Sequence, residues 1–287
     1  MKNKVERIIN RINSSDAIIL EGAISVLSAL YSDSAKILKI ILKQAVNNKN
    51  TQKILTAAKA KKIETEFFSP DEIQKLEEYI NNTGLYSIGK THGGIIAVTL
   101  KREFLSPKEL LLTLPEKQRR ISIAIIEGIE DPYNLGYAAR ALYTQGIDAL
   151  ILPERDFGFS ESTIEKASTG TFSKMPVAVF DKNINAKLDL INLLKRENFR
   201  IYCIDKKAPA NFSSKVGDIF SVKFSDRTVF IIGGEKRGIS KDFLRNADEI
   251  VRIPYAKNFA HSLAAQTAAT VVSYEIHRQR ISEKTKL

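Results

Sequence analysis

The chain has 287 residues, of which 44% are hydrophobic, so it is long enough for two domains with ordinary apolar cores. Lys and Arg outnumber Asp and Glu by 44 to 33, and the net charge of +11 suits a polyanionic partner such as nucleic acid. The single cysteine, Cys203, excludes a disulfide framework, and three scattered histidines give no metal site. No apolar run approaches the roughly eighteen residues of a membrane span and no signal peptide is recognisable, so we expect a soluble, cytoplasmic protein without metal or membrane partners.

The first hundred residues alternate helical and strand patterns. Helical patterns lie at residues 1–13, 23–30, 50–61 and 70–81, and strand patterns at 17–20 and 37–42. The stretch GKTHGGIIAVTLKR predicts a glycine-marked turn that leads into a further strand. Asn50 or Thr51 is the expected cap of the third helix, whereas Ser69 and Pro70 open the fourth. Residues 1–103 are therefore predicted to form a small α/β domain.

The pattern loosens around Pro107 and Pro115, so residues 104–119 are interpreted as a linker with one helical turn near Leu110. Beyond it, apolar strands are predicted at residues 121–126, 149–152, 176–180, 199–204 and 228–232. Helices are predicted between and after them, at residues 136–145, 162–168, 186–198 and 262–279, and Ser162 and Glu165 have the spacing of a capping box. Apolar strands that do not alternate and are separated by helices indicate a parallel sheet covered on both faces, so residues 120–287 form a second α/β domain.

Three unusual stretches follow predicted strands or precede helices of this second domain. They read DPYNLGYAAR at 131–140, VFIIGGEKRGIS at 229–240 and IPYAKNFAHSLAAQ at 253–266. In parallel sheets, ligands bind beyond the carboxyl ends of the strands, and glycines there let a bound molecule approach the backbone. Each stretch alone also has a plain structural interpretation, with Asn134 and Ser262 as helix caps and Arg140 as a solvated helix residue.

Taken together and in this order, the three stretches resemble the SpoU (TrmH) family of RNA 2′-O-ribose methyltransferases, in the SPOUT superfamily. The resemblance covers about residues 118–280 and rests on the Asn and Arg of the first stretch, the glycine-acid-glycine loop of the second and the Ile-Pro to Ser-Leu run of the third. The N-terminal stretches LEGAISVLSAL and THGGIIAV are similar to the substrate-binding domain, related to a small ribosomal protein, that is often fused to these enzymes.

This resemblance implies a trefoil knot in the second domain, S-adenosylmethionine as the cofactor and a homodimer in which Arg140 of one subunit reaches the pocket of the other. It also implies two sets of site residues. The set expected to act in catalysis comprises Arg140, Asn134, Glu235 and Ser262, and the set expected to bind the cofactor comprises Gly233, Gly234, Ile253 and Leu263.

An arginine side chain stays protonated at neutral pH, so we expect Arg140 to stabilise the developing alkoxide and grip the adjoining phosphate rather than act as a base. Glu235 would orient the arginine or its polar neighbours. Candidate phosphate contacts are the cations of residues 117–120, Lys236, Arg237 and the C-terminal tail.

One position departs from the family pattern, because Ala264 stands where the family has asparagine. Asn258, His261 and Gln266 are candidates for the missing hydrogen bond.

The expected activity is methylation of a ribose 2′-hydroxyl, more plausibly in ribosomal RNA than in transfer RNA because an RNA-binding domain is present. The alternatives are a transfer RNA 2′-O-methyltransferase, a base methyltransferase of the same superfamily and a non-catalytic RNA-binding descendant. A dinucleotide-dependent oxidoreductase is disfavoured, since no G-x-G-x-x-G follows a first strand.

Overall fold

The computed structural model describes residues 4–14, 16–32, 35–46, 48–83, 88–89, 92–115, 120–155, 161–181, 183, 185–206, 216–234 and 237–284. The chain forms two compact units. Unit 1 consists of residues 1–103 together with 156–174, and unit 2 of residues 104–155 and 175–287. The segment 156–174, which the sequence analysis placed in the second domain, therefore belongs to unit 1.

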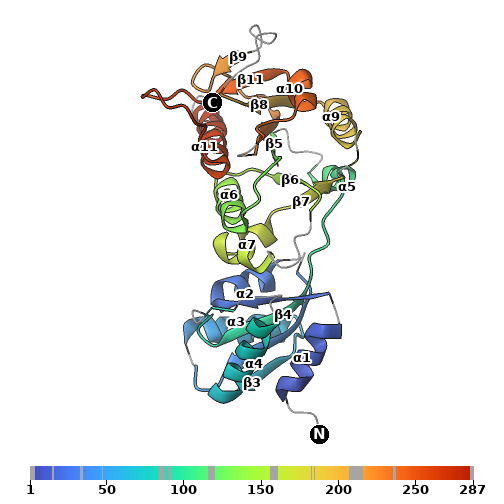
Figure 1. The fold of residues 1–287 in the computed structure, drawn as a ribbon, viewed down its shortest axis with the longest axis vertical. Coiled ribbons are helices and arrows are strands. Elements are labelled where there is room, and N and C mark those ends of the chain that lie inside the picture. Colours follow the sequence, from blue (N-terminus) through green and yellow to red (C-terminus); the bar gives the residue numbers. More distant parts are fainter. Residues whose placement is uncertain are drawn as a thin grey trace. The chain divides into compact units, whose positions relative to one another are not determined.

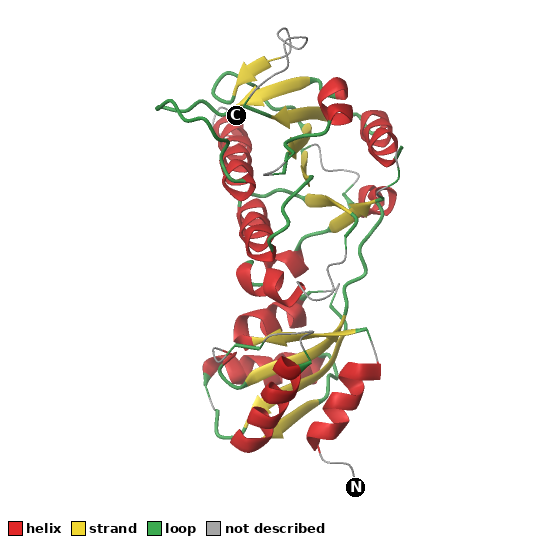
Figure 2. Cartoon of the chain, viewed as in Figure 1, coloured by secondary structure: helices red, strands yellow, loops and turns green. Residues whose placement is uncertain are grey.

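Unit 1 contains a four-stranded mixed sheet with helices on both faces (Figures 1 and 2). Its elements are α1 Lys4–Ser14, β1 Ala17–Glu21, α2 Gly22–Tyr31, β2 Ile37–Lys43, α3 Lys49–Ala60, β3 Thr65–Phe68, α4 Pro70–Asn82, β4 Ile95–Leu100, α7 Glu161–Ala167 and α8 Thr171–Lys174. The strand order is β1-β4-β2-β3, in which β4 is antiparallel to both neighbours and β2 is parallel to β3. One apolar core lies between the sheet and α1 and α4, and a second lies on the side of α2 and α3.

Local sequence explains the helix starts of unit 1. Ser69 and Glu72 form a capping box with Pro70 in the first turn of α4, as the sequence indicates. Helix α3 is capped by Asn48, whose side chain accepts hydrogen bonds from two backbone N–H groups, so the expectation of Asn50 or Thr51 was wrong. Helix α7 begins at Glu161. Ser162 therefore lies inside it and cannot cap it.

A close approach at Gly170 holds α7 and α8 against α2. A Cβ atom on Gly170 would lie 1.9 Å from the Ser28 hydroxyl oxygen, and the positive φ of +77° also favours glycine there. The Ser32 hydroxyl donates to the Ser173 carbonyl at 2.7 Å, and Lys166 pairs with Glu21 at 2.6 Å. These contacts depend on residues more than a hundred positions apart, which is why sequence periodicity gave no sign of them.

Unit 2 contains a seven-stranded sheet in which every pair of neighbours is parallel (Figure 2). Its elements are α5 Pro107–Thr113, β5 Ile121–Ile126, α6 Pro132–Thr144, β6 Ala149–Pro153, β7 Val177–Phe180, α9 Ala186–Arg196, β8 Arg200–Ile204, β9 Val216–Asp218, β10 Arg227–Ile232, α10 Lys241–Asn246, β11 Glu249–Arg252 and α11 Ala265–Lys284. The strand order is β7-β6-β5-β10-β8-β11-β9. The predicted parallel α/β sheet is confirmed, whereas the knot stays a prediction.

Helices cover both faces of this sheet, as the apolar strands indicate. Helices α5, α9 and α10 pack on one face with the alternate β5 residues Ile121, Ile123 and Ile125, while α6 and α11 contact each other and α11 also contacts β10. The predicted helical turn near Leu110 is α5, whose Leu110 is buried in the core of unit 2. Cys203 is a buried residue of the same core, and burial raises the pKa of its thiol, so it serves as a small apolar side chain.

Candidate active site

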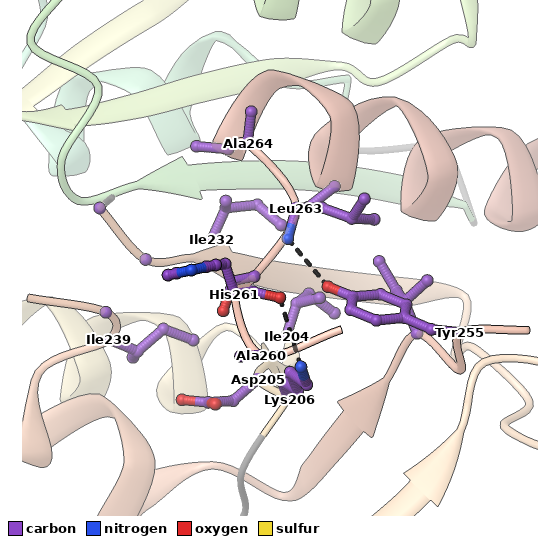
Figure 3. Close-up of a pocket in the computed structure, with 17 residues that line it drawn as sticks. Ile204, Asp205, Lys206, Ile232, Ile239, Tyr255, Ala260, His261, Leu263 and Ala264 are labelled. Carbon is purple, nitrogen blue, oxygen red and sulfur yellow. Dashed lines mark hydrogen bonds between the residues drawn. The ribbon is translucent and has the colours of Figure 1, made fainter. Parts of the chain in front are cut away.

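A cavity of about 590 Å³ opens at the carboxyl ends of β8, β10 and β11 (Figure 3). Because all strands of the sheet are parallel, these ends and the loops that follow them lie at one edge. The lining comes from residues 204–206 after β8, from 232–234, 238 and 239 around the glycine loop, and from 253, 255, 260–265 and 268. Most of these residues are glycine, alanine or aliphatic, with a few polar groups among them, as in many small-molecule sites.

The glycine loop after β10 is held by its own backbone. Gly234 and Gly238 exchange two hydrogen bonds, N–H to C=O, at 3.2 and 2.9 Å, and Gly238 has a φ of +63°. A Cβ on Gly233 would lie only 2.3 Å from the carbonyl carbon of Gly238 and 2.5 Å from the Ile239 nitrogen. Glycine at position 233 is therefore required for this loop to fold back on itself and form one wall of the cavity.

The opposite wall, between β11 and α11, is fixed by Lys206 and Tyr255. The Leu263 N–H donates to the Tyr255 hydroxyl at 2.8 Å, and Figure 3 shows this bond beside that of Lys206 Nζ to the His261 carbonyl, at 3.3 Å. Lys206 Nζ also donates to the Phe259 carbonyl and lies 4.9 Å from the centroid of the Tyr255 ring. These contacts keep the loop of residues 259–263 against the sheet edge.

The structure brings five of the eight predicted site residues to this cavity. Gly233, Gly234, Ile253, Ser262 and Leu263 all line it. Ser262 does not cap the last helix, because α11 begins only at Ala265.

The remaining three predicted residues lie elsewhere. Glu235 lies outside the described residues. Arg140 is exposed on α6 and does not line the cavity, and neither does Asn134 in the first turn of that helix. Asn134 is linked to α11 instead, because Gln266 Nε2 donates to Asn134 Oδ1 at 3.0 Å. Gln266, one of the three candidates for the missing asparagine of the third motif, thus contacts a predicted site residue.

Sequence reasoning missed Lys206 and Tyr255. Lys206 stands two positions after the predicted strand 199–204. Because ligands bind beyond the carboxyl ends of parallel strands, that position could have identified Lys206 as a site residue. Tyr255 gave no such signal, because its partner, the Leu263 N–H, is a backbone group.

Among the described residues no group of three or more His, Cys, Asp or Glu side chains could hold a metal ion. None of the described helices is long and apolar enough to cross a membrane.

Residues 122–274 match the model of the SpoU rRNA Methylase family, and residues 19–105 match the model described as RNA 2′-O ribose methyltransferase substrate binding. A Staphylococcus epidermidis protein named as a TrmH family tRNA/rRNA methyltransferase is 27% identical over 263 residues, covering 92% of this chain and 96% of its own length. A Staphylococcus aureus protein of the same name is 25% identical over 242 residues, covering 84% of this chain and 88% of its own.

Solved structures of the same fold cover nearly the whole chain. The SpoU methyltransferase AviRb of Streptomyces viridochromogenes, solved in complex with the cofactor AdoMet, aligns with a TM-score of 0.69 at 19% identity, over 98% of this chain and 95% of its own. A structure described as an RNA 2′-O ribose methyltransferase aligns with a TM-score of 0.69 at 20% identity, over 94% and 91% of the two chains. At these identities the likeness shows the fold, and the predicted fold class is confirmed.

Proposed function

The chain belongs to the SpoU rRNA Methylase family of RNA methyltransferases, and we propose that it transfers a methyl group from S-adenosylmethionine to a ribose 2′-hydroxyl of RNA. Ribosomal RNA is the substrate that we favour, because residues 19–105 match a substrate-binding domain. Such a substrate would place the protein in the cytoplasm. The observation that carries the proposal is the convergence of Gly233, Gly234, Ile253 and Leu263 on one cavity at the sheet edge.

The cavity fits this cofactor in size and lining. About 590 Å³ lies within the usual range of 300 to 1,000 Å³ for small-molecule sites. Gly233 and Gly234 leave room for the ligand beside the backbone, and Ile232, Ile253 and Leu263 offer apolar surface for an adenine ring. When bound, S-adenosylmethionine supplies a methyl group on a positively charged sulfur. We propose that this chain binds it through backbone groups at Gly233, Gly234, Ile253 and Leu263.

The transfer is an in-line displacement that needs alignment more than strong acids or bases. With the cofactor bound, the ribose 2′-oxygen would bond to the methyl carbon as the bond from that carbon to sulfur broke, sulfur would keep the electron pair, and the hydroxyl proton would pass to solvent. We propose that Arg140 stabilises the developing negative charge on the 2′-oxygen. Asn134, Glu235 and Ser262 would position the ribose and the arginine.

The position of Arg140 favours a homodimer. It shares one face of α6 with Tyr133 and Tyr137, whose surfaces are 50% and 52% exposed, and α11, which contacts α6, carries Tyr274 at 57% exposure. Exposed aromatic side chains that share one helix face, as Tyr133 and Tyr137 do, are typical of protein interfaces. We propose that these faces pair in a symmetric dimer and that Arg140 of the partner subunit completes each cavity.

We also propose a separate role for each part of the chain. Residues 1–103 would bind the RNA, 104–119 would link the domains, and 120–287, apart from the segment 156–174 of unit 1, would carry out the transfer. A test of the whole proposal is to map 2′-O-methyl sites in total RNA from cells with and without the gene. A missing site in ribosomal RNA supports the favoured substrate, a missing site only in transfer RNA supports the alternative, and an unchanged map contradicts both.

Subunit mixing tests the shared site. Arg140→Ala and Gly233→Ala should each abolish methylation, whereas the exposed Arg245→Ala on α10 serves as a matched control and should not. If the partner's Arg140 completes the cavity, a mixture of the two inactive variants should regain up to about a quarter of wild-type activity, because half the dimers are mixed and each has one intact site. No regained activity in dimers shown to be mixed would contradict the shared site.

A further inference from the structure

Two side chains with hydroxyl groups, those of Ser262 and Tyr255, line the cavity of about 590 Å³ at the carboxyl edge of the sheet. Ser262 belongs to the residues proposed to position the ribose and the arginine. Tyr255 has only a structural role so far, because its hydroxyl bonds to the backbone of the loop that follows. A phenol suits the wall of a small-molecule site, because its ring is apolar and its hydroxyl can orient a ligand.

The Tyr255 side chain is held both at its hydroxyl and at its ring. The Leu263 N–H donates to the hydroxyl at 2.8 Å, as Figure 3 shows. The Lys206 Nζ lies 4.9 Å from the ring centroid, and this ammonium group also donates to the His261 carbonyl at 3.3 Å. A side chain that is already fixed loses little conformational entropy when a ligand binds to it, so a contact with it contributes more to affinity.

The Tyr255 hydroxyl still has a hydrogen to donate. A hydroxyl group has one O–H donor and two acceptor positions, and the Leu263 N–H uses one of these acceptor positions. Among the residues that the structure describes, no group accepts the hydrogen of this hydroxyl. Because a hydroxyl that accepts a hydrogen bond becomes a stronger donor, the Tyr255 O–H suits an acceptor atom of a ligand in the cavity.

Adenine is the part of the cofactor that fits this donor best. Ile253 and Leu263 line the same cavity and offer apolar surface, and adenine has apolar faces and ring nitrogens that accept hydrogen bonds. The methionine carboxylate would need a cation, and the nearby ammonium group of Lys206 already donates to the Phe259 and His261 carbonyls. An adenine nitrogen is therefore the expected acceptor.

We propose that Tyr255 is a cofactor-binding residue whose hydroxyl donates to a ring nitrogen of the adenine, and that the Leu263 N–H acts through this hydroxyl. The inference rests on the proposed function, since it names a further residue that holds the same cofactor. It also changes the part assigned to Leu263, because its N–H orients the tyrosine and does not bond to the base directly.

The test measures, by calorimetry, the binding of S-adenosylhomocysteine, which is the cofactor without its methyl group. The same measurement is made with its 1-deaza, 3-deaza and 7-deaza forms, each of which replaces one ring nitrogen by a C–H group. Tyr255→Phe keeps the ring beside Lys206 and removes only the hydroxyl, so it should bind S-adenosylhomocysteine about 3- to 10-fold more weakly than the wild type does. For one deaza form, and for that form alone, the wild type and Tyr255→Phe should bind equally, because the acceptor is already missing.

A matched variant and two outcomes decide the inference. Tyr31→Phe removes an exposed hydroxyl from α2 in unit 1 and should bind all four compounds like the wild type. If Tyr255→Phe binds S-adenosylhomocysteine as tightly as the wild type does, the hydroxyl does not contact the ligand. If its loss is the same for all four compounds, the hydroxyl does not contact a ring nitrogen, and either result overturns the inference. Wild-type protein that binds none of the four compounds contradicts the proposed function, and the inference with it.

Discussion

Two groups of polar residues in this molecule have opposite characters. In unit 2, the polar residues at the open edge of the parallel sheet line a cavity made mostly of glycine, alanine and aliphatic residues. In unit 1, Glu161 and Glu165 are buried and Arg102 is partly buried where α7 and α8 pack on the sheet. The carboxyl groups with raised pKa values are in the second group, so a perturbed pKa here marks packing, and the candidate active site is marked by its cavity instead.

Each charged residue of the unit 1 group has a hydrogen-bond partner. Arg102 N–H donates to Glu161 Oε2 at 3.2 Å, and the Arg102 guanidinium donates to the Phe172 carbonyl at 2.6 Å and lies 5.0 Å from the centre of that ring. The Ser173 hydroxyl donates to Glu165. Burial raises the pKa of both carboxyl groups, whereas the nearby positive charge of Arg102 lowers both pKa values. One cation therefore lies near two acids, and ionising both acids would cost free energy.

The largest effect is expected from removing the Arg102 charge. Arg102→Met should destabilise the protein by about 3 to 5 kcal/mol, because it leaves buried carboxylates without their cation. Chemical denaturation followed by circular dichroism measures this loss. The additional change Glu165→Gln should recover part of the stability, since it removes one of those acids. A loss below about 1 kcal/mol in Arg102→Met would show that the group is not a structural ion cluster.

The next effect concerns the open site. Gly233→Ala places a Cβ against Gly238, so the loop must shift and the affinity for S-adenosylmethionine should fall at least ~100-fold, or about 2.7 kcal/mol. Gly146→Ala is the control, since a Cβ there meets nothing within 4 Å and only the positive φ is strained. That variant should lose some stability and bind the cofactor normally. Equal affinities in the wild type and Gly233→Ala would contradict the cavity assignment.

A smaller effect is the pH dependence of unit 1. Burial raises the pKa of Glu161 from 4.5 to about 7, so the folded protein binds this proton more tightly than the unfolded chain does. Stability from this group is therefore greatest below pH 4.5 and declines as the pH rises to about 7. Glu161→Gln should reduce the difference in unfolding free energy between pH 5 and pH 8 by about 2 kcal/mol. If the unfolding free energy changes with pH in the same way in the wild type and in Glu161→Gln, burial of Glu161 is not a cause of the pH dependence.

The smallest effect lies between α6 and α11. Gln266→Ala removes the hydrogen bond to Asn134 and should slow methyl transfer about 3- to 10-fold, with unchanged affinity for S-adenosylmethionine. Thr267→Ala changes an exposed neighbour in the same turn and should have no such effect. Restoring the family asparagine with Ala264→Asn in the Gln266→Ala background should recover activity. Failure of that rescue would argue against Gln266 as a positioning residue.

The fold was largely predictable because its signals are local. Apolar runs followed by turn residues identified β5, β6, β7, β8 and β10, and the capping box at Ser69 identified α4. The strands β9 and β11 were missed because they have only three or four residues and contain charged side chains. The sequence predicts the helix α7 and misses α8, and it does not say that Gly170 packs against Ser28, because that contact joins distant parts of unit 1.

The candidate site was predictable where a motif has its own local geometry. The glycines of the 233–238 loop and the Ile-Pro and Ser-Leu pairs could be assigned to a strand edge, and the structure gathers them around one cavity. Partners across the sheet could not be assigned in this way. The Tyr255 hydroxyl meets the Leu263 backbone, and Gln266 meets Asn134 from another helix, so neither pairing leaves a spacing pattern in the sequence.

The most direct test of ribose methylation uses purified protein, S-adenosylmethionine labelled in its methyl group, and deproteinised ribosomal RNA from cells that lack the gene. After complete nuclease digestion, mass spectrometry identifies the labelled nucleoside. We expect a single 2′-O-methylated nucleoside, with the label on the sugar, that disappears in Arg140→Ala. Label on a base, or no transfer by protein that binds both S-adenosylmethionine and RNA, would contradict it.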